Sequence, residues 1–270
     1  MTGQLADNCH TAADSSCTGY LSFACISNTG LRRPHNEDNY LFFDQILPEE
    51  HQSIEHALLA MAPQKALSVV AVFDGMGGEL AGEGASFSAA SCLKNERSSL
   101  TLDEASLTST FDKMQSAVRS FRAQEKLSST GSTAVVLVCQ GGQALLGNLG
   151  DSKAFLLHAG QLSTLSVSHT DEEILRELGI HRKPGLTQFL GVDDTDAAIE
   201  PHVVRIALEP GDRILLASDG LTDMVDEPSI RDMMVSVPET GALVEILCEK
   251  ALQAGGIDNV TIICCDVPVH

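Results

Sequence analysis

The most informative segment of the sequence is Leu67-Ser-Val-Val-Ala-Val-Phe73, which is followed by Asp74-Gly-Met-Gly-Gly78. An almost continuously apolar run of this length is typical of a β-strand that is buried on both faces. An acidic residue at the end of such a strand, beside a glycine, is expected to be exposed and free to hold a ligand. The stretch therefore predicts a central strand with the Asp74 carboxylate at its tip.

The same arrangement of an apolar run beside an acidic residue returns along the chain. Asp151 follows the run 145–149, Asp219 follows 213–217, and Asp258 stands just before 260–265. One Asp-Gly pair is ordinary turn chemistry, but turns explain the combination less easily. Together with Asn36-Glu37-Asp38, these acids supply enough oxygen ligands for more than one divalent cation.

Carboxylates grouped in this way suit hard cations such as Mg²⁺, which takes a few carboxylates and keeps several waters. Two such ions about 4 Å apart can activate a bridging water as a nucleophile at neutral pH. The glycines Gly75, Gly150 and Gly220 are expected to let the backbone turn sharply next to the acids. The carbonyl of Gly75 could act as a further ligand.

The order of the predicted elements indicates the fold class. Strands are predicted at 20–27, 39–43, 67–73, 132–139, 143–149, 153–158, 161–165, 199–207, 213–217 and 260–265. Helices are predicted at 49–61, 79–93, 102–127, 171–178, 229–235 and 240–254. Because strands come in hairpin clusters and helices in pairs, the chain is predicted to be an antiparallel α+β domain, with helices covering the faces of the sheets. One domain over 20–268 is expected, after a loose lead-in at 1–19.

Composition excludes several classes of partner. The chain has 270 residues and a formal net charge of −20, which argues against nucleic acid because phosphate contacts need clustered Lys and Arg. Dispersed acidity of this kind is also the ordinary property of a solvated surface. No stretch reaches the roughly 20 apolar residues that span a bilayer, and the N-terminus lacks the pattern of a secretory signal. We therefore expect a cytoplasmic protein without a membrane span.

The eight cysteines form no C-x-x-C pair, and most lie within apolar runs. We interpret them as reduced, buried small hydrophobic residues. Cys264 and Cys265 are expected to point to opposite faces of one strand. The alternative is a metal or redox site made by Cys9, Cys17 and Cys25.

Other phosphate-binding motifs fail in detail around Asp74. A dinucleotide fingerprint needs a third glycine, where Leu80 stands, and a P-loop needs a G-K-[ST] ending that is absent. An aspartyl-phosphate enzyme would need a second acid two residues after the first, where Met76 stands.

Taken together, the motifs resemble those of the metal-dependent PPM family, the type 2C serine/threonine protein phosphatases, in the style of its bacterial members. The motifs that carry the resemblance are Arg33-Pro-His-Asn-Glu-Asp38, Asp74-Gly-Met-Gly-Gly78, Gly131-Ser-Thr-Ala134, Gly147-Asn-Leu-Gly-Asp-Ser152, Leu186-Thr-Gln-Phe-Leu-Gly191, the segment 208–221 and Asp258-Asn-Val-Thr261. The resemblance covers about residues 20 to 267. It implies a four-layer αββα sandwich with a metal centre at one end, between the sheets.

The resemblance also implies roles for individual residues. Asp74 would bridge two Mn²⁺ or Mg²⁺ ions, and Gly75 would offer its carbonyl. The remaining ligands would be Glu37, Asp38, Asp219 and Asp258, with Asp151 and Asp219 at a third, weaker metal. Arg33 would grip the substrate phosphate. The implied reaction is in-line attack of a metal-activated bridging water on phosphoserine or phosphothreonine, without a phosphoenzyme. The implied partners are phosphorylated proteins made by a serine/threonine kinase, and we expect a monomer.

The chain departs from the family pattern in the flap, which is short and covers about 168–187. Ser168 and Gln188 replace the aspartate and arginine that are usual there. Met76 stands where eukaryotic members carry a histidine, so His35 is weighed as a proton donor against an ordinary loop histidine. His169 is interpreted as a structural residue. The short flap and Gln188 motivate one alternative to an active phosphatase, a catalytically weak phosphoprotein-binding regulatory domain of the same fold. A stress-response phosphatase acting on an anti-sigma-factor antagonist would differ in substrate only.

Overall fold

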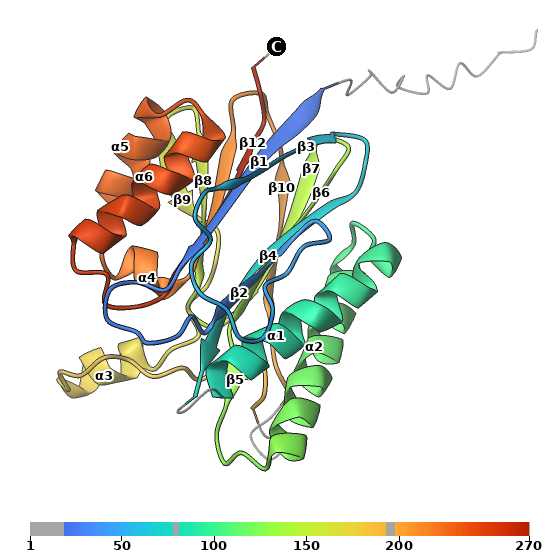
Figure 1. Ribbon diagram of the computed structural model, residues 1–270. Helices are drawn as coiled ribbons and strands as arrows, with labels where there is room; N and C mark the ends of the chain where they lie inside the picture. The colour runs from blue at the N-terminus through green and yellow to red at the C-terminus, as the bar shows by residue number, and fades with distance from the viewer. Residues whose placement is uncertain (1–18, 78–80, 193–197, 270) are drawn as a thin grey trace, which may run out of the picture.

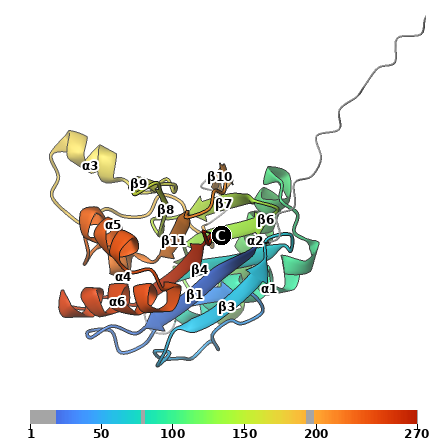
Figure 2. The same cartoon turned by 90° about the horizontal axis from the view of Figure 1, so that it is seen from above.

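The computed structural model describes residues 19–77, 81–192 and 198–269. The lead-in predicted at 1–19, apart from its last residue, lies outside these ranges, as do Cys9, Cys17 and the start of the helix predicted from residue 79. Two sheets form the middle of the molecule, and helices cover both of their outer sides (Figures 1 and 2). The predicted α+β sandwich of two antiparallel sheets is confirmed.

Each sheet is built from neighbouring antiparallel strands. The first has the order β3 (Leu58–Pro63), β1 (Tyr20–Asn28), β12 (Val260–Asp266), β11 (Arg213–Ala217), β8 (Lys153–His158) and β9 (Gln161–Thr164). The second has the order β10 (His202–Ala207), β7 (Gln143–Leu149), β6 (Ala134–Gln140), β4 (Ser68–Met76) and β2 (Asp38–Phe42), and the short β5 (Gly131–Ser132) pairs with the end of β4. The predicted hairpin turns at 141–142 and 159–160 are confirmed.

Two groups of helices lie on opposite outer faces. The second sheet packs against α1 (Ala81–Glu96) and α2 (Glu104–Glu125), which a 3₁₀ turn at Arg97–Ser99 links. The first sheet packs against α4 (Asp219–Thr222), α5 (Glu227–Ser236) and α6 (Thr240–Gln253). The short α3 (Glu172–Leu178) stands apart from both groups (Figure 2). No helix among the described residues is long and apolar enough to cross a membrane.

The apolar run in β4 is continuous because its two faces belong to two different cores. Val70 and Val72 point between the sheets, while Val69, Ala71 and Phe73 point toward α1 and α2. Successive side chains of a strand alternate between faces, so a strand covered on both sides must be apolar at every position. The strand therefore holds Asp74 at the end of a rigid, fully packed element.

The last strand, β12, uses the same principle on the other sheet. Cys265 packs between the sheets and Cys264 packs against the helices, as the sequence predicts. Both thiols are buried, and burial raises the pKa of Cys264 well above its usual value. The cysteines of the described residues are free, and all are buried except the half-buried Cys92.

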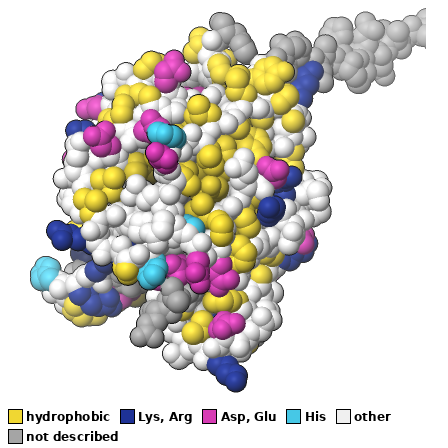
Figure 3. Space-filling view, viewed as in Figure 1, with side chains coloured by type: hydrophobic (Ala, Val, Ile, Leu, Met, Phe, Trp, Pro, Cys, Tyr) yellow, Lys and Arg dark blue, Asp and Glu magenta, His cyan; other side chains and the backbone are white. Residues whose placement is uncertain are grey.

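The helix predicted at 49–61 is wrong, because residues 49–57 are not helical and the segment from Leu58 onward forms the edge strand β3. Leu58 and Ala60 pack against the core between the sheets, whereas Leu59 and Met61 are 69% and 67% exposed. The spacing of apolar residues that suggested a helix hides this two-residue alternation. Figure 3, which has the same view as Figure 1, shows hydrophobic side chains along the middle of the molecule.

Candidate metal centre

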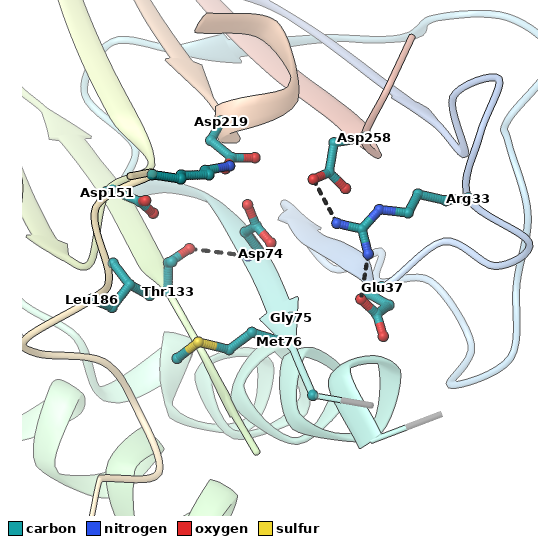
Figure 4. A pocket seen from close by; sticks show the side chains of 12 residues that line it. Arg33, Glu37, Asp74, Gly75, Met76, Thr133, Asp151, Leu186, Asp219 and Asp258 are labelled. Atoms are coloured by element: carbon teal, nitrogen blue, oxygen red, sulfur yellow. Dashed lines mark hydrogen bonds and ion pairs between the residues drawn. The ribbon is translucent and has the colours of Figure 1, made fainter. Parts of the chain in front are cut away.

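The ends of β2, β4 and β12 and the start of α4 meet at one end of the sandwich. They surround a cavity of about 290 Å³ whose walls include the predicted Arg33, Glu37, Asp74, Gly75, Asp151, Asp219 and Asp258. Figure 4 shows the carboxylates of Asp74, Asp151, Asp219 and Asp258 directed toward the same space. Residues that lie up to 225 positions apart in the chain are thus neighbours here, as the hydrogen bond between Arg33 and Asp258 shows.

Asp38 is the one predicted ligand that lies beneath this cavity rather than in its wall. It sits opposite Asp74 in the pairing of β2 with β4 and is only 1% exposed. Ser218 donates a hydrogen bond of 2.7 Å from its Oγ to Asp38 Oδ2, and its backbone caps the start of α4. The hydroxyl therefore ties the Asp38 carboxylate to the element that carries Asp219.

Asn259 holds the loop that carries Arg33 and Glu37 in place. Its Nδ2 donates to the backbone oxygens of Thr29 and His35, at 2.8 and 2.9 Å. Its Oδ1 accepts from the backbone N–H of Glu37 at 2.8 Å. A side chain that satisfies three backbone groups in this way fixes the loop against β12.

The expectation that the three glycines let the backbone turn is correct only for Gly150, which has a φ of +102°. At Gly75 and Gly220 the reason is close approach of another backbone segment. A Cβ on Gly75 would lie 2.2 Å from the carbonyl oxygen of Gly82, and one on Gly220 would lie 1.9 Å from that of Asn259. Both glycines therefore allow neighbouring segments to pack next to the acids.

The acids raise one another's pKa values. Burial, then repulsion from Asp219 and Asp38, raises the pKa of Asp74 well above its usual range. Burial is also the main cause that raises the pKa of Asp38 to about 7 and that of Asp151 to about 6. Carboxylates held together at this cost form a site that favours positive charge.

Two cationic side chains lie among these acids. Arg33 Nη2 is 2.7 Å from Asp258 Oδ2, and Nη1 is 3.8 Å from Glu37 Oε2. Lys183 Nζ is 3.0 Å from both Asp219 Oδ2 and Asp223 Oδ2. As placed, no three His, Cys, Asp or Glu side chains of the described ranges come together as the ligands of one ion.

The donor set nevertheless fits hard divalent cations. The wall of the cavity offers carboxylate and backbone oxygens and neither sulfur ligands of Cys nor imidazoles. Oxygen-only sites of this kind suit Mg²⁺ and Mn²⁺ rather than softer metals. Burial first, and then repulsion from neighbouring acids, raises the pKa values of Asp74 and Asp38, and a bound cation would offset both effects.

Three residues of the centre were not singled out from the sequence. Lys183 belongs to the flap, and only its place in that segment hinted at a role. Thr133 Oγ1 accepts a hydrogen bond of 3.1 Å from the Asp74 backbone N–H, and it lies in one of the quoted motifs. His51 Nε2 lies 2.7 Å from the backbone oxygen of Asp38, with no sequence signal that could have indicated it.

The two histidines weighed from the sequence differ in the structure. His35 is exposed, and its Nδ1 lies 3.7 Å from Glu83 Oε1, which is itself buried. His169 is half-buried against Gly150, whose backbone N–H approaches its Nδ1 at 3.2 Å. Burial lowers the pKa of His169, which disfavours the charged form of its ring. The position of His169 agrees with the structural role, and neither histidine lines the cavity.

Comparison with known proteins gives a consistent match. The model of the family described as "Protein phosphatase 2C" matches residues 46–176. The serine/threonine protein phosphatase PstP of Mycobacterium tuberculosis is 29% identical over 92% of this chain, which spans only 45% of that relative's length. The serine/threonine phosphatase stp of Listeria monocytogenes is 29% identical over 88% of this chain and 92% of its own length.

Solved structures agree with the sequence matches. The structure of the catalytic domain of PstP in complex with two manganese ions has a TM-score of 0.73 and 26% identity. The match covers 93% of this chain and all of that chain. The similarity therefore extends over nearly the whole chain.

Proposed function

Since this chain belongs to the PPM family of type 2C protein phosphatases, we propose that it hydrolyses phosphoserine and phosphothreonine in proteins with the help of divalent cations. The observation that carries the proposal is the cavity of about 290 Å³ in which five predicted acids and one arginine meet. Residues 20–268 would act as one phosphatase domain. This activity concerns the part of the longer relatives that the chain spans.

The proposal assigns two Mn²⁺ or Mg²⁺ ions to the carboxylates around Asp74. Asp74 pairs with Asp38 across β2 and β4 and shares the cavity with Asp219, so it is suited to contact both ions. Glu37, Asp38, Asp219, Asp258 and the Gly75 carbonyl would complete the two ligand sets. Bound ions would supply a water of lowered pKa as the nucleophile and positive charge for the phosphoryl oxygens. A third ion at Asp151 and Asp219 would have to displace the Lys183 ammonium.

The protein itself would position the substrate. The exposed guanidinium of Arg33 stands at the rim of the cavity, where its planar donors can meet two oxygens of a phosphate. Its present partners, Asp258 and Glu37, are candidate metal ligands. When those carboxylates turn to cations, the guanidinium becomes available to the substrate.

This role predicts the effect of Arg33→Lys, which keeps the charge and removes the bidentate geometry. We expect kcat/KM for a phosphothreonine peptide to fall by roughly 10- to 100-fold, equivalent to about 1.4–2.8 kcal/mol. The neighbouring exposed Arg32, which does not line the cavity, provides the matched control Arg32→Lys. Equal kinetics for the two variants would contradict the assignment.

The proposed function itself is tested by turnover with Mn²⁺. We expect a phosphothreonine peptide to be hydrolysed with Mn²⁺, little hydrolysis of the matching phosphotyrosine peptide, and none of either in EDTA. Hydrolysis is measured as the release of inorganic phosphate. The general substrate p-nitrophenyl phosphate is tested in the same way. Absence of metal-dependent release from every substrate would overturn the proposal.

One observation favours the alternative of a catalytically weak phosphoprotein-binding domain. Lys183, from the short flap, lies directly on the acids of the centre. Calorimetry with the phosphothreonine peptide distinguishes the two functions, because tight binding without turnover would support the alternative. The partners that we propose are proteins that a serine/threonine kinase has phosphorylated. We also propose that the phosphatase is a monomer and acts in the cytoplasm.

A further inference from the structure

Lys183, a residue of the flap, lies where two cavities of the metal centre adjoin. Its Nζ lies 3.0 Å from Asp219 Oδ2 and 3.0 Å from Asp223 Oδ2. With Asp151 and Asp219, it lines both the main cavity and an adjoining one of about 270 Å³. A cationic side chain therefore stands among Asp151, Asp219 and Asp223 at the outer edge of the centre.

The base of the flap holds Lys183 in this place. Asp171 and Gly185 exchange hydrogen bonds: the Asp171 backbone N–H donates to the Gly185 oxygen at 3.0 Å, and the Gly185 N–H donates to Asp171 Oδ1 at 2.7 Å. Arg182 also pairs with Asp171. Residues on both sides of Lys183 are thus tied to Asp171, Gly185 through its backbone and Arg182 through its side chain. The ion pairs of Lys183 in turn connect the flap to α4 and the residue after it.

An ammonium group and a divalent ion cannot occupy this place together. A divalent ion such as Mg²⁺ binds carboxylate oxygens at about 2.0–2.1 Å, so an ion on Asp219 Oδ2 would lie close to the Lys183 nitrogen. Two cations at that separation repel strongly, and the ammonium would have to leave. Binding of an ion at the outer edge is therefore coupled to release of the flap.

We propose that Lys183 is a built-in cation that takes the place of a divalent ion at Asp151, Asp219 and Asp223, so that the centre binds two ions and the flap stays closed over them. The inference rests on the proposed two-metal centre and adds the regulation of its outer edge. In this proposal the positive charge beside Asp151, Asp219 and Asp223 comes from the Lys183 side chain and not from a third metal ion. Removing the ammonium should open a weaker site for a further ion.

The test counts Mn²⁺ ions by equilibrium dialysis and isothermal titration on the full chain. We expect the unmodified protein to bind two ions and Lys183→Gln to bind three, the additional one more weakly. Lys153→Gln is the matched control, because Lys153 lines the adjoining cavity but pairs with Glu227 at 3.3 Å. This control should bind two ions. The double variant with Asp151→Asn should return Lys183→Gln to two.

A second measurement follows the flap directly. Hydrogen exchange of the backbone amides at 171–185 should be faster in Lys183→Gln than in the unmodified protein or in Lys153→Gln. Equal ion counts and equal exchange in Lys183→Gln and the unmodified protein would overturn the inference, as would three ions in the unmodified protein. If no variant binds Mn²⁺ at millimolar concentration, the metal centre itself fails and the inference with it. Phosphate release from the peptide is measured separately. If a variant loses only this activity, the ion counts still decide whether Lys183 replaces a metal ion.

Discussion

Asp74→Asn is expected to lower metal-dependent kcat/KM by about 10³-fold or more, which corresponds to roughly 4 kcal/mol of transition-state stabilisation. Asp74 lines the cavity at the end of β4, and Asp219, Asp38, Asp151 and Asp258 all contribute to raising its pKa, after burial. It is therefore the carboxylate best placed to serve both ions. Asparagine keeps the shape but removes the charge that would hold them, so the Mn²⁺ affinity should fall as well.

The same substitution should leave the metal-free protein at least as stable as before. The charged Asp74 is unfavourable without cations, because burial and the neighbouring acids raise its pKa. Thermal unfolding in EDTA at pH 8 should thus show an equal or higher Tm for Asp74→Asn. The exposed Asp232 on α5 provides the control Asp232→Asn, which should keep full activity. A variant that loses activity only because it unfolds in EDTA would contradict the assigned role.

Much of the fold follows from periodicity, because most strands belong to two packed layers. The run before Asp74 is apolar at every position since its side chains serve the core between the sheets and the core under α1 and α2. The segment 49–61 was misread because an edge strand such as β3 needs apolar residues on one face only. The spacing of Ile54, Ala57, Leu58 and Met61 imitates one face of a helix, although Met61 is exposed on the strand.

The acids of the centre could also be predicted, since each one stands at the end of a strand pattern. The contacts that orient them could not, because they depend on how distant segments cross. Ser218 reaches Asp38 across 180 positions, and Lys183 reaches Asp219 across 36. Neither distance is visible in a local pattern. The reason for Gly75 and Gly220, a close backbone approach rather than a turn, likewise appears only in three dimensions.

The metal-free protein should be more stable at pH 5 than at pH 8, contrary to the usual behaviour of proteins rich in acids. Burial raises the pKa of Asp38 from 3.8 to about 7, and that of Asp151 to about 6. Between about pH 4 and pH 7 the folded form therefore holds protons that the unfolded chain has already lost. Stability falls as pH rises through this window, because the folded state binds more protons.

The size of this effect can be bounded from Asp38. Between pH 5 and pH 8 only the part of the shift above pH 5 counts, which is about two pKa units or on the order of 3 kcal/mol, and this is an upper limit because the acids titrate together. Carboxylates with lowered pKa values, such as Asp171 and Asp226, change the stability only below about pH 4. They therefore do not alter the pH dependence between pH 5 and pH 8. Urea unfolding in EDTA at the two pH values measures the difference.

Saturating Mn²⁺ should reverse the slope, because ions compete with protons for the same carboxylates and bind more tightly as pH rises. Asp38→Asn should flatten the curve in EDTA. His158→Gln is the control, since the pKa of exposed His158 is raised by Asp212, far from the cavity. That variant should keep most of the pH dependence. Stability in EDTA that rises between pH 5 and pH 8 would show that the acids are not held together in the way the cavity requires.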